Sequence, residues 1–382
     1  MKIAINMFMP PNHGGFHTYN YNVLNGILKK DKKNTFYVFL NQESKELFSI
    51  PVSERIRIIY ISNFFSNTIL KHFWTQMVLP FKVLLLKIDV LFCPINFIPI
   101  ILKISSIKNI VVIHTNLPIL YPKFLKNNGI IRLFFLRYFL KTSIIFSDNV
   151  IVNSKTAKLE LEAKFPSLKR KISVIYLSVD IKRFKKNQLK ENFYKSEMID
   201  VSKDKYFLSI SSAAPYHKLI EVVKAFEELD KKNDHLPKLL LITKNVDNKY
   251  YLKLKGYIKT SSASQKIIQI EYVDQKFLPS IYRNSELYIF SSCCEVFGFT
   301  NLEAMSCGVP VLTAKKSAMP EICGDAAVYF NPNNYKDIAE KIDSVFKNNI
   351  LKLTMIRKGF KQVQKYSWDL TCKKTLKVLL NK

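Results

Sequence analysis

The sequence predicts an α/β protein with two Rossmann-like, doubly wound domains. The chain has 382 residues, about twice the size of an ordinary single domain. Short β-branched and aromatic runs alternate with helix-length segments, which is the pattern of parallel strands joined by crossover helices. The alternation occurs in two series, and a polar, highly charged stretch at 181–205 separates them.

The two series contain seven and six expected strands. The first seven lie at 3–8, 35–40, 55–61, 90–93, 110–114, 149–153 and 173–177. The other six lie at 206–211, 239–243, 267–272, 287–290, 310–313 and 327–330. The expected helices include 18–30, 156–165, 219–231, 302–307 and 335–347.

These elements predict a domain at 1–185, a linker at 186–205, a domain at 206–365 and a final segment at 366–382. Ligands of doubly wound sheets bind beyond the carboxyl ends of the strands. The cleft between the two domains is therefore the expected active site.

The composition indicates a globular protein of a reducing compartment, which we expect to be the cytoplasm. The start, MKIAINMF, lacks a signal-peptide pattern. The apolar stretch 81–104 is interrupted by four charged residues and two prolines, which makes it a poor transmembrane helix. The six cysteines form no CxxC pair, so neither a disulfide framework nor a zinc site is expected. They are Cys93, Cys293, Cys294, Cys307, Cys323 and Cys372.

The net charge of +29 is concentrated in the first half of the chain. Residues 1–190 hold 29 Lys and Arg against 9 Asp and Glu, whereas residues 191–382 hold 30 against 21. Codon bias explains a general richness in lysine but not this asymmetry. A basic first half predicts an anionic partner, either membrane lipid or nucleic acid.

The sharpest functional signal is the segment EVFGFTNLEAMSCGVPV at 295–311. It follows the expected buried strand LYIFSS and leads through a helix into the strand VPVLTA. Glu295 lies in the loop after the first strand, where it is placed to meet a sugar ring. Glu303 lies in the first turns of the helix, where it can accept hydrogen bonds from ribose hydroxyls.

The backbone between the two glutamates suits a diphosphate. Gly298 allows the backbone to approach a ligand closely. The helix N-terminus attracts anions, and the amides expected to bind a diphosphate there are those of Phe299, Thr300 and Asn301. Taken singly, the glutamates could be a helix-dipole residue and a plain loop residue. The spacing and the strand–loop–helix context favour the functional interpretation.

This segment resembles that of the retaining glycosyltransferases of family 4, whose pattern is EGFGLPxLEAMACGxPV. Their fold, GT-B, has two Rossmann-like domains facing an interdomain cleft. The stretch MPEICGDAAVYF at 319–330 is similar to the family's PE(I/V)xGDAAxxF segment. Tyr-Ser-Trp at 366–368 and the basic, apolar helix after it resemble the family's last helix, which crosses back onto the first domain. The resemblance covers nearly the whole chain, and its specificity is concentrated in 295–325.

A second landmark is FLSISSAAPYHKLIEVVKAF at 207–226. Lys218 falls on the family's lysine that binds the donor diphosphate, where a cation stabilises the leaving group. The alternative is a solvated first-turn lysine, which a helix N-terminus disfavours unless an anion is nearby. Because Ser212-Ala213 replaces the family's Gly-Arg, His217 is the other cationic candidate, and Ser212 is a further donor-binding candidate.

In the first domain, Asn12-His13-Gly14-Gly15 resembles the family's glycine-rich turn beside the donor phosphates and the acceptor. A Gly-Gly turn by itself is common in βα loops. His114 ends the strand NIVVIH, where the family's histidine reaches the transferred hexose, and a purely structural histidine is the alternative. Thr115 stands where the family has an aspartate.

The resemblance implies retaining transfer of a hexose from a nucleoside-diphosphate sugar to a hydroxyl of a lipid-linked or surface-glycan acceptor. O-antigen, lipopolysaccharide and capsule are glycans of this kind. In the family, the leaving phosphate is thought to help deprotonate the acceptor. Glu295, His114 and Lys218 would be catalytic. Mannose is slightly favoured, because members with a stretch like Trp74-Thr-Gln76 often use it, but UDP-hexoses and dTDP-deoxysugars stay open.

No cofactor or metal is expected, since no DxD-type motif precedes the site. An epimerase or a glucan synthase of the same fold is a weaker candidate, because the paired glutamates and the short first domain argue against both. The alternative classes are a non-catalytic GT-B protein and a nucleic-acid-binding one. The basic residues form no recognised nucleic-acid-binding pattern, so no nucleic-acid partner is expected.

The basic segment KFLKNNGIIRLFFLRYFLK at 123–141 predicts contact with an anionic membrane surface. Between Asp89 and Asp148 there are 58 residues without an acidic side chain. Cations mixed with bulky apolar residues over a helix length are typical of an interfacial helix. The alternative is a core helix with a basic edge, and Gly129 weakens the helix start. Peripheral association with the inner membrane is the expectation.

Overall fold

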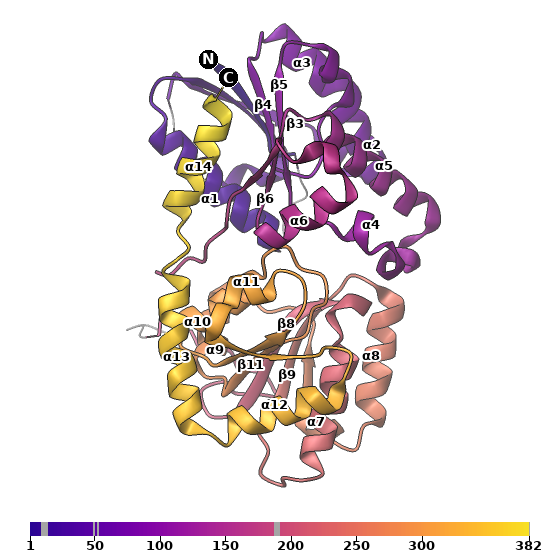
Figure 1. Cartoon of the computed structure of the whole chain (residues 1–382), viewed down its shortest axis with the longest axis vertical. Coiled ribbons are helices and arrows are strands. Elements are labelled where there is room, and N and C mark those ends of the chain that lie inside the picture. Colours follow the sequence, from indigo (N-terminus) through magenta and orange to yellow (C-terminus); the bar gives the residue numbers. More distant parts are fainter. Residues whose placement is uncertain (9–13, 49, 52, 187–191, 382) are drawn as a thin grey trace. The chain divides into compact units, whose positions relative to one another are not determined.

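The computed structural model describes residues 1–8, 14–48, 50–51, 53–186 and 192–381. The chain divides into two compact units, which we describe separately (Figure 1). Unit 1 comprises Met1–Pro122, Gly129–Leu177 and Ser367–Lys382. Unit 2 comprises Lys123–Asn128 and Ser178–Tyr366.

Within the described residues, unit 1 is built on a seven-stranded parallel sheet in the order β3-β2-β1-β4-β5-β6-β7. The inner strands are near-continuous apolar runs, as strands covered by helices on both faces must be. The strands are β1 (Lys2–Asn6), β2 (Thr35–Asn41), β3 (Ile56–Ile61), β4 (Val90–Cys93), β5 (Lys108–Ile113), β6 (Asn149–Val152) and β7 (Ile172–Val174).

Helices and short turns connect these strands. The helices are α1 (Gly14–Lys30), α2 (Thr68–Phe73), α3 (Leu79–Leu85), α4 (Leu117–Leu120), α5 (Ile130–Phe146) and α6 (Lys155–Lys164). A π-helical turn, Trp74–Val78, joins α2 to α3. The 3₁₀ turns are Gln42–Leu47, Asn63–Ser66, Ile100–Ile104, Pro122–Asn128 and Pro166–Leu168.

The C-terminal helix α14 (Trp368–Leu380) packs against α1. Lys30 forms an ion pair with Asp369, and the Cys372 thiol donates to the Asn22 carbonyl at 3.5 Å. Gly26 permits this close packing, because a Cβ atom placed on it would lie 2.2 Å from Cys372 Sγ. The last segment of the chain is therefore part of unit 1.

Unit 2 has a six-stranded parallel sheet among its described residues, in the order β10-β9-β8-β11-β12-β13. Its strands are β8 (Tyr206–Ala213), β9 (Lys238–Asn245), β10 (Ile267–Ile270), β11 (Leu287–Phe290), β12 (Val311–Ala314) and β13 (Ala327–Phe330). Its helices are α7 (Leu219–Asp230), α8 (Asn248–Thr260), α9 (Leu278–Arg283), α10 (Phe299–Ser306), α11 (Met319–Cys323), α12 (Tyr335–Phe346) and α13 (Asn349–Val363). The 3₁₀ turns are Pro215–His217, Ser264–Lys266, Gln275–Phe277 and Gly324–Ala326.

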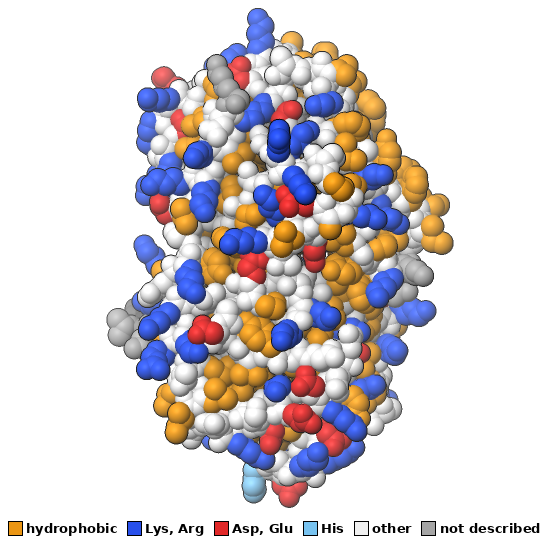
Figure 2. All heavy atoms as spheres, in the orientation of Figure 1, with side chains coloured by type: hydrophobic (Ala, Val, Ile, Leu, Met, Phe, Trp, Pro, Cys, Tyr) orange, Lys and Arg blue, Asp and Glu red, His pale blue; other side chains and the backbone are white. Residues whose placement is uncertain are grey.

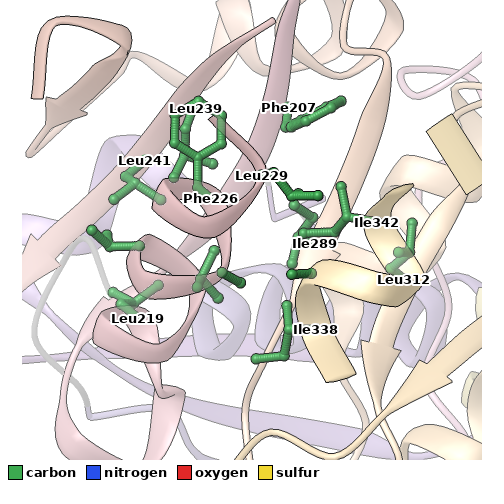
Figure 3. Close-up of a cluster of buried hydrophobic side chains, with 14 of the residues drawn as sticks. Phe207, Leu219, Phe226, Leu229, Leu239, Leu241, Ile289, Leu312, Ile338 and Ile342 are labelled. Carbon is green, nitrogen blue, oxygen red and sulfur yellow. The ribbon is translucent and has the colours of Figure 1, made fainter. Parts of the chain in front are cut away.

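The core of unit 2 lies between the sheet and the helices α7 and α12. Phe207 on β8 and Leu239 on β9 meet Phe226 on α7, and Ile338 on α12 closes the same cluster (Figure 3). All four side chains are buried. This packing anchors β8 and α7, and so positions the turn between them.

The predicted fold class, α/β with two doubly wound, Rossmann-like domains, is confirmed. Both sheets are parallel, and each expected strand lies within a few residues of an observed one. The helix expected at 302–307 begins earlier, at Phe299, because Gly298 caps it in a left-handed conformation. None of the helices in the described residues combines the length and apolar character that a membrane span needs.

Two segments differ from their sequence-based expectations. The described part of the expected linker packs on unit 2, where Ile199 and Val201 are buried. The segment at 123–141 is not one helix. Gly129, at φ 87°, separates a 3₁₀ turn ending at Asn128 from α5, and Lys123–Asn128 joins unit 2 whereas α5 belongs to unit 1.

Candidate donor site in unit 2

The strands β8 and β11 pair directly, at the point where the winding of the sheet reverses. The loops that follow these strands contact each other. The Cys293 amide donates to the Tyr216 carbonyl at 2.8 Å, and the Ser291 hydroxyl donates to the His217 carbonyl at 2.5 Å. Because ligands of doubly wound sheets bind beyond the strand ends at such a reversal, these two loops form the candidate donor site.

Glu295 lies in the loop after β11. Its Oε1 accepts a hydrogen bond from the Ser292 hydroxyl at 2.9 Å, and its backbone carbonyl accepts one from the Ala318 amide at 3.2 Å. Burial raises the pKa of the Glu295 carboxyl to about 7, although the Ser292 hydrogen bond favours the ionised form. A carboxyl group that titrates near neutrality at a ligand-binding edge is typical of functional sites.

His217 is buried beside Glu295 and is uncharged. Its Nε2 lies 3.0 Å from Ser212 Oγ, and its Nδ1 lies 3.7 Å from Glu295 Oε1. Burial lowers the pKa of the imidazole to about 3, so the ring is neutral at pH 7. Burial disfavours the second ring proton that a charged imidazole needs, so the structure does not support the prediction of His217 as a second cation. Its Nδ1 has no hydrogen-bond partner among the described residues.

Gly298 starts α10 at φ 80° and ψ 62°, a conformation that favours glycine. A Cβ atom at this position would lie 2.6 Å from Met319 Cε and 2.8 Å from Met319 Sδ. The backbone conformation therefore favours glycine, and a larger residue would also have to displace the end of the Met319 side chain. Phe299 and Thr300, the first residues of α10, are partly exposed, and their amides stay the predicted donors to a diphosphate.

The backbone amide of Asn301 is not free to donate to a diphosphate. Its side chain is fully buried, and its Nδ2 donates to Met319 Sδ at 3.0 Å. Its amide donates to the Gly298 carbonyl at 3.3 Å, which closes the first turn. The prediction of an open amide at Asn301 is therefore wrong, because the helix uses this donor itself.

Glu303 is oriented by a buried tyrosine. The Tyr282 hydroxyl donates to Glu303 Oε2 at 2.9 Å, and the Tyr282 ring packs edge-on against Tyr288 with ring centres 5.4 Å apart. The pKa of Glu303 is raised overall, because the effect of burial exceeds the opposing effects of the Tyr282 hydrogen bond and the charge of Arg183. Tyr282 thus holds one carboxylate oxygen and leaves Oε1 to accept hydroxyl groups of a ligand.

Lys218 caps the start of α7 in the left-handed conformation, with φ 54° and ψ 34°. Its Nζ lies 3.8 Å from Glu221 Oε1 in the first turn of the helix. The sequence suggests that a lysine at this helix N-terminus needs a nearby anion, such as a bound phosphate. Glu221 already supplies that anion, so the position of Lys218 does not by itself indicate a phosphate. The left-handed backbone costs roughly 1–2 kcal/mol for a residue with a side chain, and such strain clusters at functional sites.

Two further lysines approach this site that the sequence argument missed. The charges of Lys218, Lys316 and Lys123 all lower the pKa of the Cys293 thiol, although burial raises it more. Lys316 follows β12, and Lys123 begins the segment that joins unit 2. Both are distant from Lys218 in sequence and belong to no recognised motif. Both lysines therefore add positive charge near Cys293 in the loop after β11.

The predicted residues of unit 1 form a separate group. His114 Nε2 lies 3.1 Å from the Pro94 carbonyl, and its Nδ1 lies 3.3 Å from Asn153 Nδ2. Its ring packs against Phe16 and Tyr19, with ring centres 4.6 Å away in each case. Burial lowers the pKa of the imidazole to about 4. His114 is therefore a neutral, hydrogen-bonded histidine, which fits a positioning role better than proton transfer.

The glycine-rich turn of unit 1 is described only in part. Gly14 and Gly15 begin α1 and are exposed, whereas Asn12 and His13 lie outside the described residues. Gly14 has φ 34°, and a Cβ atom on it would meet nothing within 4 Å. The backbone conformation therefore favours glycine here, and the space beside it is open.

Trp74 and Gln76 stabilise unit 1. Trp74 is buried and packs edge-on against Phe8, with ring centres 5.1 Å apart. The Gln76 amide donates to the Ile98 carbonyl at 2.9 Å and accepts from the Ile100 amide at 3.0 Å. Both side chains thus have a packing role in unit 1.

Comparison with known sequence families identifies the class of protein. Residues 13–183 match Glycosyltransferase Family 4, and residues 191–362 match Glycosyl transferases group 1. The two matches correspond closely to the two sheets. The chain therefore belongs to the glycosyltransferases that join these two domains.

Individual relatives are more distant. The chain is 33% identical over 98 residues to O-antigen chain mannosyltransferase B of Escherichia coli, an alignment that covers 26% of each protein. It is 24% identical over 238 residues to the O-antigen chain mannosyltransferase RfbU of Salmonella typhimurium, covering 62% of this chain and 60% of that protein. The alignments thus span 60% or less of these two relatives.

A solved structure extends the likeness to the whole chain. HepE of Anabaena, crystallised with UDP and glucose, superposes with a TM-score of 0.73 over 99% of both chains at 17% identity. At this identity the likeness concerns the fold, and the fold is GT-B.

Replacing Glu295 by glutamine should flatten the pH dependence of stability. Burial raises the folded-state pKa of this carboxyl from 4.5 to about 7, so between these values the folded state binds more protons than the unfolded state. Stability contributed by protonated Glu295 is then lost as the pH rises through this window. The loss is at most about 3 kcal/mol.

Urea unfolding of wild type and Glu295→Gln at about pH 4 and about pH 8 measures this effect. We expect the variant to gain stability relative to wild type at the higher pH. Parallel pH profiles for the two proteins would contradict the raised pKa.

Proposed function

We propose that this chain is a retaining hexosyltransferase. It takes the hexose from a nucleoside-diphosphate sugar and adds it to a hydroxyl of a lipid-linked or surface-glycan acceptor. The observation that carries the proposal is the convergence of Glu295, Glu303 and Lys218 on the carboxyl edge of the unit 2 sheet, around the reversal between β8 and β11. Family membership supports the same conclusion.

Each group has a distinct role in this proposal. Glu303 accepts the ribose hydroxyls, with Tyr282 fixing its orientation. Lys218, together with the amides at the start of α10, balances the charge of the leaving diphosphate. Glu295 faces the transferred sugar, where positive charge develops as the glycosidic bond breaks. Ionised Glu295 stabilises that charge, and its pKa near neutrality keeps a substantial ionised fraction at physiological pH.

Mannose is the favoured sugar. The relatives in Escherichia coli and Salmonella typhimurium are named mannosyltransferases, whereas the superposable HepE structure holds UDP and glucose. The sequence relationship is the stronger guide to the sugar, because structural likeness at 17% identity extends across many donors. We assign Gly14, Gly15 and His114 of unit 1 to positioning roles in the same reaction.

The described residues contain no group of three or more His, Cys, Asp or Glu side chains placed to hold a metal ion. We propose that transfer proceeds with lysines and amides as the counter-charges for the diphosphate. Activity in excess EDTA should then equal that in buffer. Loss of activity that magnesium or manganese restores would overturn this part of the proposal.

Glu303→Ala should weaken donor binding, whereas Glu295→Ala should mainly lower turnover. Loss of a charged hydrogen bond costs roughly 1.5–3 kcal/mol, which corresponds to a decrease of about one to two powers of ten in affinity or rate. Calorimetric titration with GDP, UDP and dTDP measures the first effect and identifies the base. Tyr282→Phe is the matched control, because it keeps the carboxylate of Glu303 but frees its orientation, and it should show a smaller loss. Unchanged nucleotide affinity in Glu303→Ala would contradict the assignment.

Lys218→Ala should reduce kcat/KM far more than Lys218→Arg, because a cation must balance the leaving diphosphate. The neighbouring anion provides a control. Glu221→Gln removes the competing partner of Lys218 and should leave nucleotide affinity equal to or tighter than that of wild type. Activity of Lys218→Ala within a few-fold of wild type would remove this lysine from the site.

A further inference from the structure

Unit 1 exposes an unusual amount of apolar surface on its helices. Along the helical stretch from α2 through α3, Phe73, Met77, Phe81 and Leu85 follow one another at intervals of four residues. Residues spaced by four lie on one face of a helix. This face is exposed: Phe81 is 69% and Leu85 71% accessible to solvent. The opposite side of the stretch, with Trp74, Leu79 and Val83, is already buried against the sheet.

Helix α5 repeats this pattern. Its buried residues, Leu140, Ser143 and Ile144, all lie in its second half. The first half presents Ile130, Ile131, Phe134, Phe135 and Tyr138 to solvent, each at least half exposed. An ordinary surface helix would show polar residues at these positions.

The two exposed stripes belong to one surface. His72 of α2 stacks on Phe139 of α5 with ring centres 4.8 Å apart. The 3₁₀ turn Ile100–Ile104, where Ile104 is 89% exposed, lies against α5. Figure 2 shows hydrophobic side chains gathered along the edge of unit 1 that α3, α2 and α5 form in Figure 1, with Lys and Arg beside them. We call this surface the apolar face.

The charges around the apolar face are mainly positive. Arg132, Arg137 and Lys141 are exposed on α5. Asp89 is the sole acidic residue in the sequence from 55 to 147, which contains 12 Lys and Arg. Its carboxylate accepts the Lys2 amide at the start of β1. Lys103 of the Ile100–Ile104 turn pairs with Asp148, which follows α5, at 3.9 Å. The face therefore combines bulky apolar side chains with an excess of positive charge.

We propose that the apolar face docks on the surface of an anionic lipid bilayer. Phe, Leu and Ile side chains on helices enter the boundary between headgroups and acyl chains, and flanking cations pair with anionic headgroups. A second copy of the chain is disfavoured as the occupant, because two such faces would bring like charges together. The proposal deepens the proposed function, since a lipid-linked acceptor lies at such a surface, but its observations come from unit 1 alone.

Co-sedimentation of the whole chain with vesicles tests the apolar contribution. Wild type should bind vesicles of phosphatidylcholine with phosphatidylglycerol, bind phosphatidylcholine alone much less, and lose binding at high salt. A fourfold serine variant of the face should lose binding, namely Phe81→Ser, Leu85→Ser, Phe134→Ser and Phe135→Ser. The matched control changes four exposed apolar residues of unit 2, namely Leu252→Ser, Tyr272→Ser, Ile350→Ser and Leu353→Ser, and should bind like wild type.

A second variant tests the contribution of the positive charges on α5 to vesicle binding, and it leaves the apolar side chains unchanged. Each cation near an anionic surface contributes about fivefold in binding, so removing three should weaken it about a hundredfold at low salt. The variant is Arg132→Ser, Arg137→Ser and Lys141→Ser. Its control removes the same charge from α8 of unit 2, by Lys253→Ser, Lys255→Ser and Lys259→Ser.

Three results would overturn the proposal. The first is an equal loss of vesicle binding in a variant and in its control. The second is equal binding of wild type to both vesicle types. The third is a wild-type dimer that the fourfold variant dissociates while neither protein binds vesicles. Nucleotide affinity of the docking variants should match that of wild type, so failure of membrane docking is distinguishable from failure of the donor site.

Discussion

Because β8 pairs directly with β11, the loops after these two strands must leave the same edge of the sheet side by side. Two hydrogen bonds then join them, one through the Tyr216 carbonyl and one through the His217 carbonyl. The remaining features of the candidate donor site depend on this pairing. It brings Lys218, which follows β8, to the same edge as Glu295, which follows β11, although the two lie 77 positions apart in the sequence.

The electrostatics of the site follow from burial within these loops. His217 is too enclosed to be charged, so it offers Glu295 a neutral neighbour and leaves the carboxyl pKa near 7. A bound nucleotide sugar would bring the diphosphate close to Lys218, and developing positive charge on the sugar would favour ionised Glu295. In the proposed reaction, the site would thus gain more electrostatic stabilisation during bond cleavage than in the resting state.

Sequence reasoning located the strand–loop–helix unit around Glu295, Gly298 and Glu303, because strand ends, a left-handed glycine and a helix start all have local signatures. It failed where the outcome depends on tertiary burial. His217 is neutral because the β8 loop encloses it, and the Asn301 side chain is buried against Met319. No spacing rule reports such packing.

Contacts between residues distant in the sequence could not be predicted either. Lys123 belongs to unit 2, whereas α5, which follows Gly129, belongs to unit 1, and Lys316 follows the end of β12. The sequence shows the basic, apolar character of 123–141, but it does not show that the apolar stripe on α2 and α3 is exposed. A helical apolar spacing normally indicates a buried face, and only a structure distinguishes a buried stripe from an exposed one.

The central claim is that a nucleoside diphosphate binds at the reversal between β8 and β11. Hydrogen–deuterium exchange of the whole chain, with and without GDP, UDP or dTDP, tests it most directly. The account predicts slower exchange in peptides covering 212–219 and 292–304 with one of these nucleotides, and unchanged exchange in α5 and α8. Protection confined to other segments, or none with any nucleotide at saturating concentration, would contradict it.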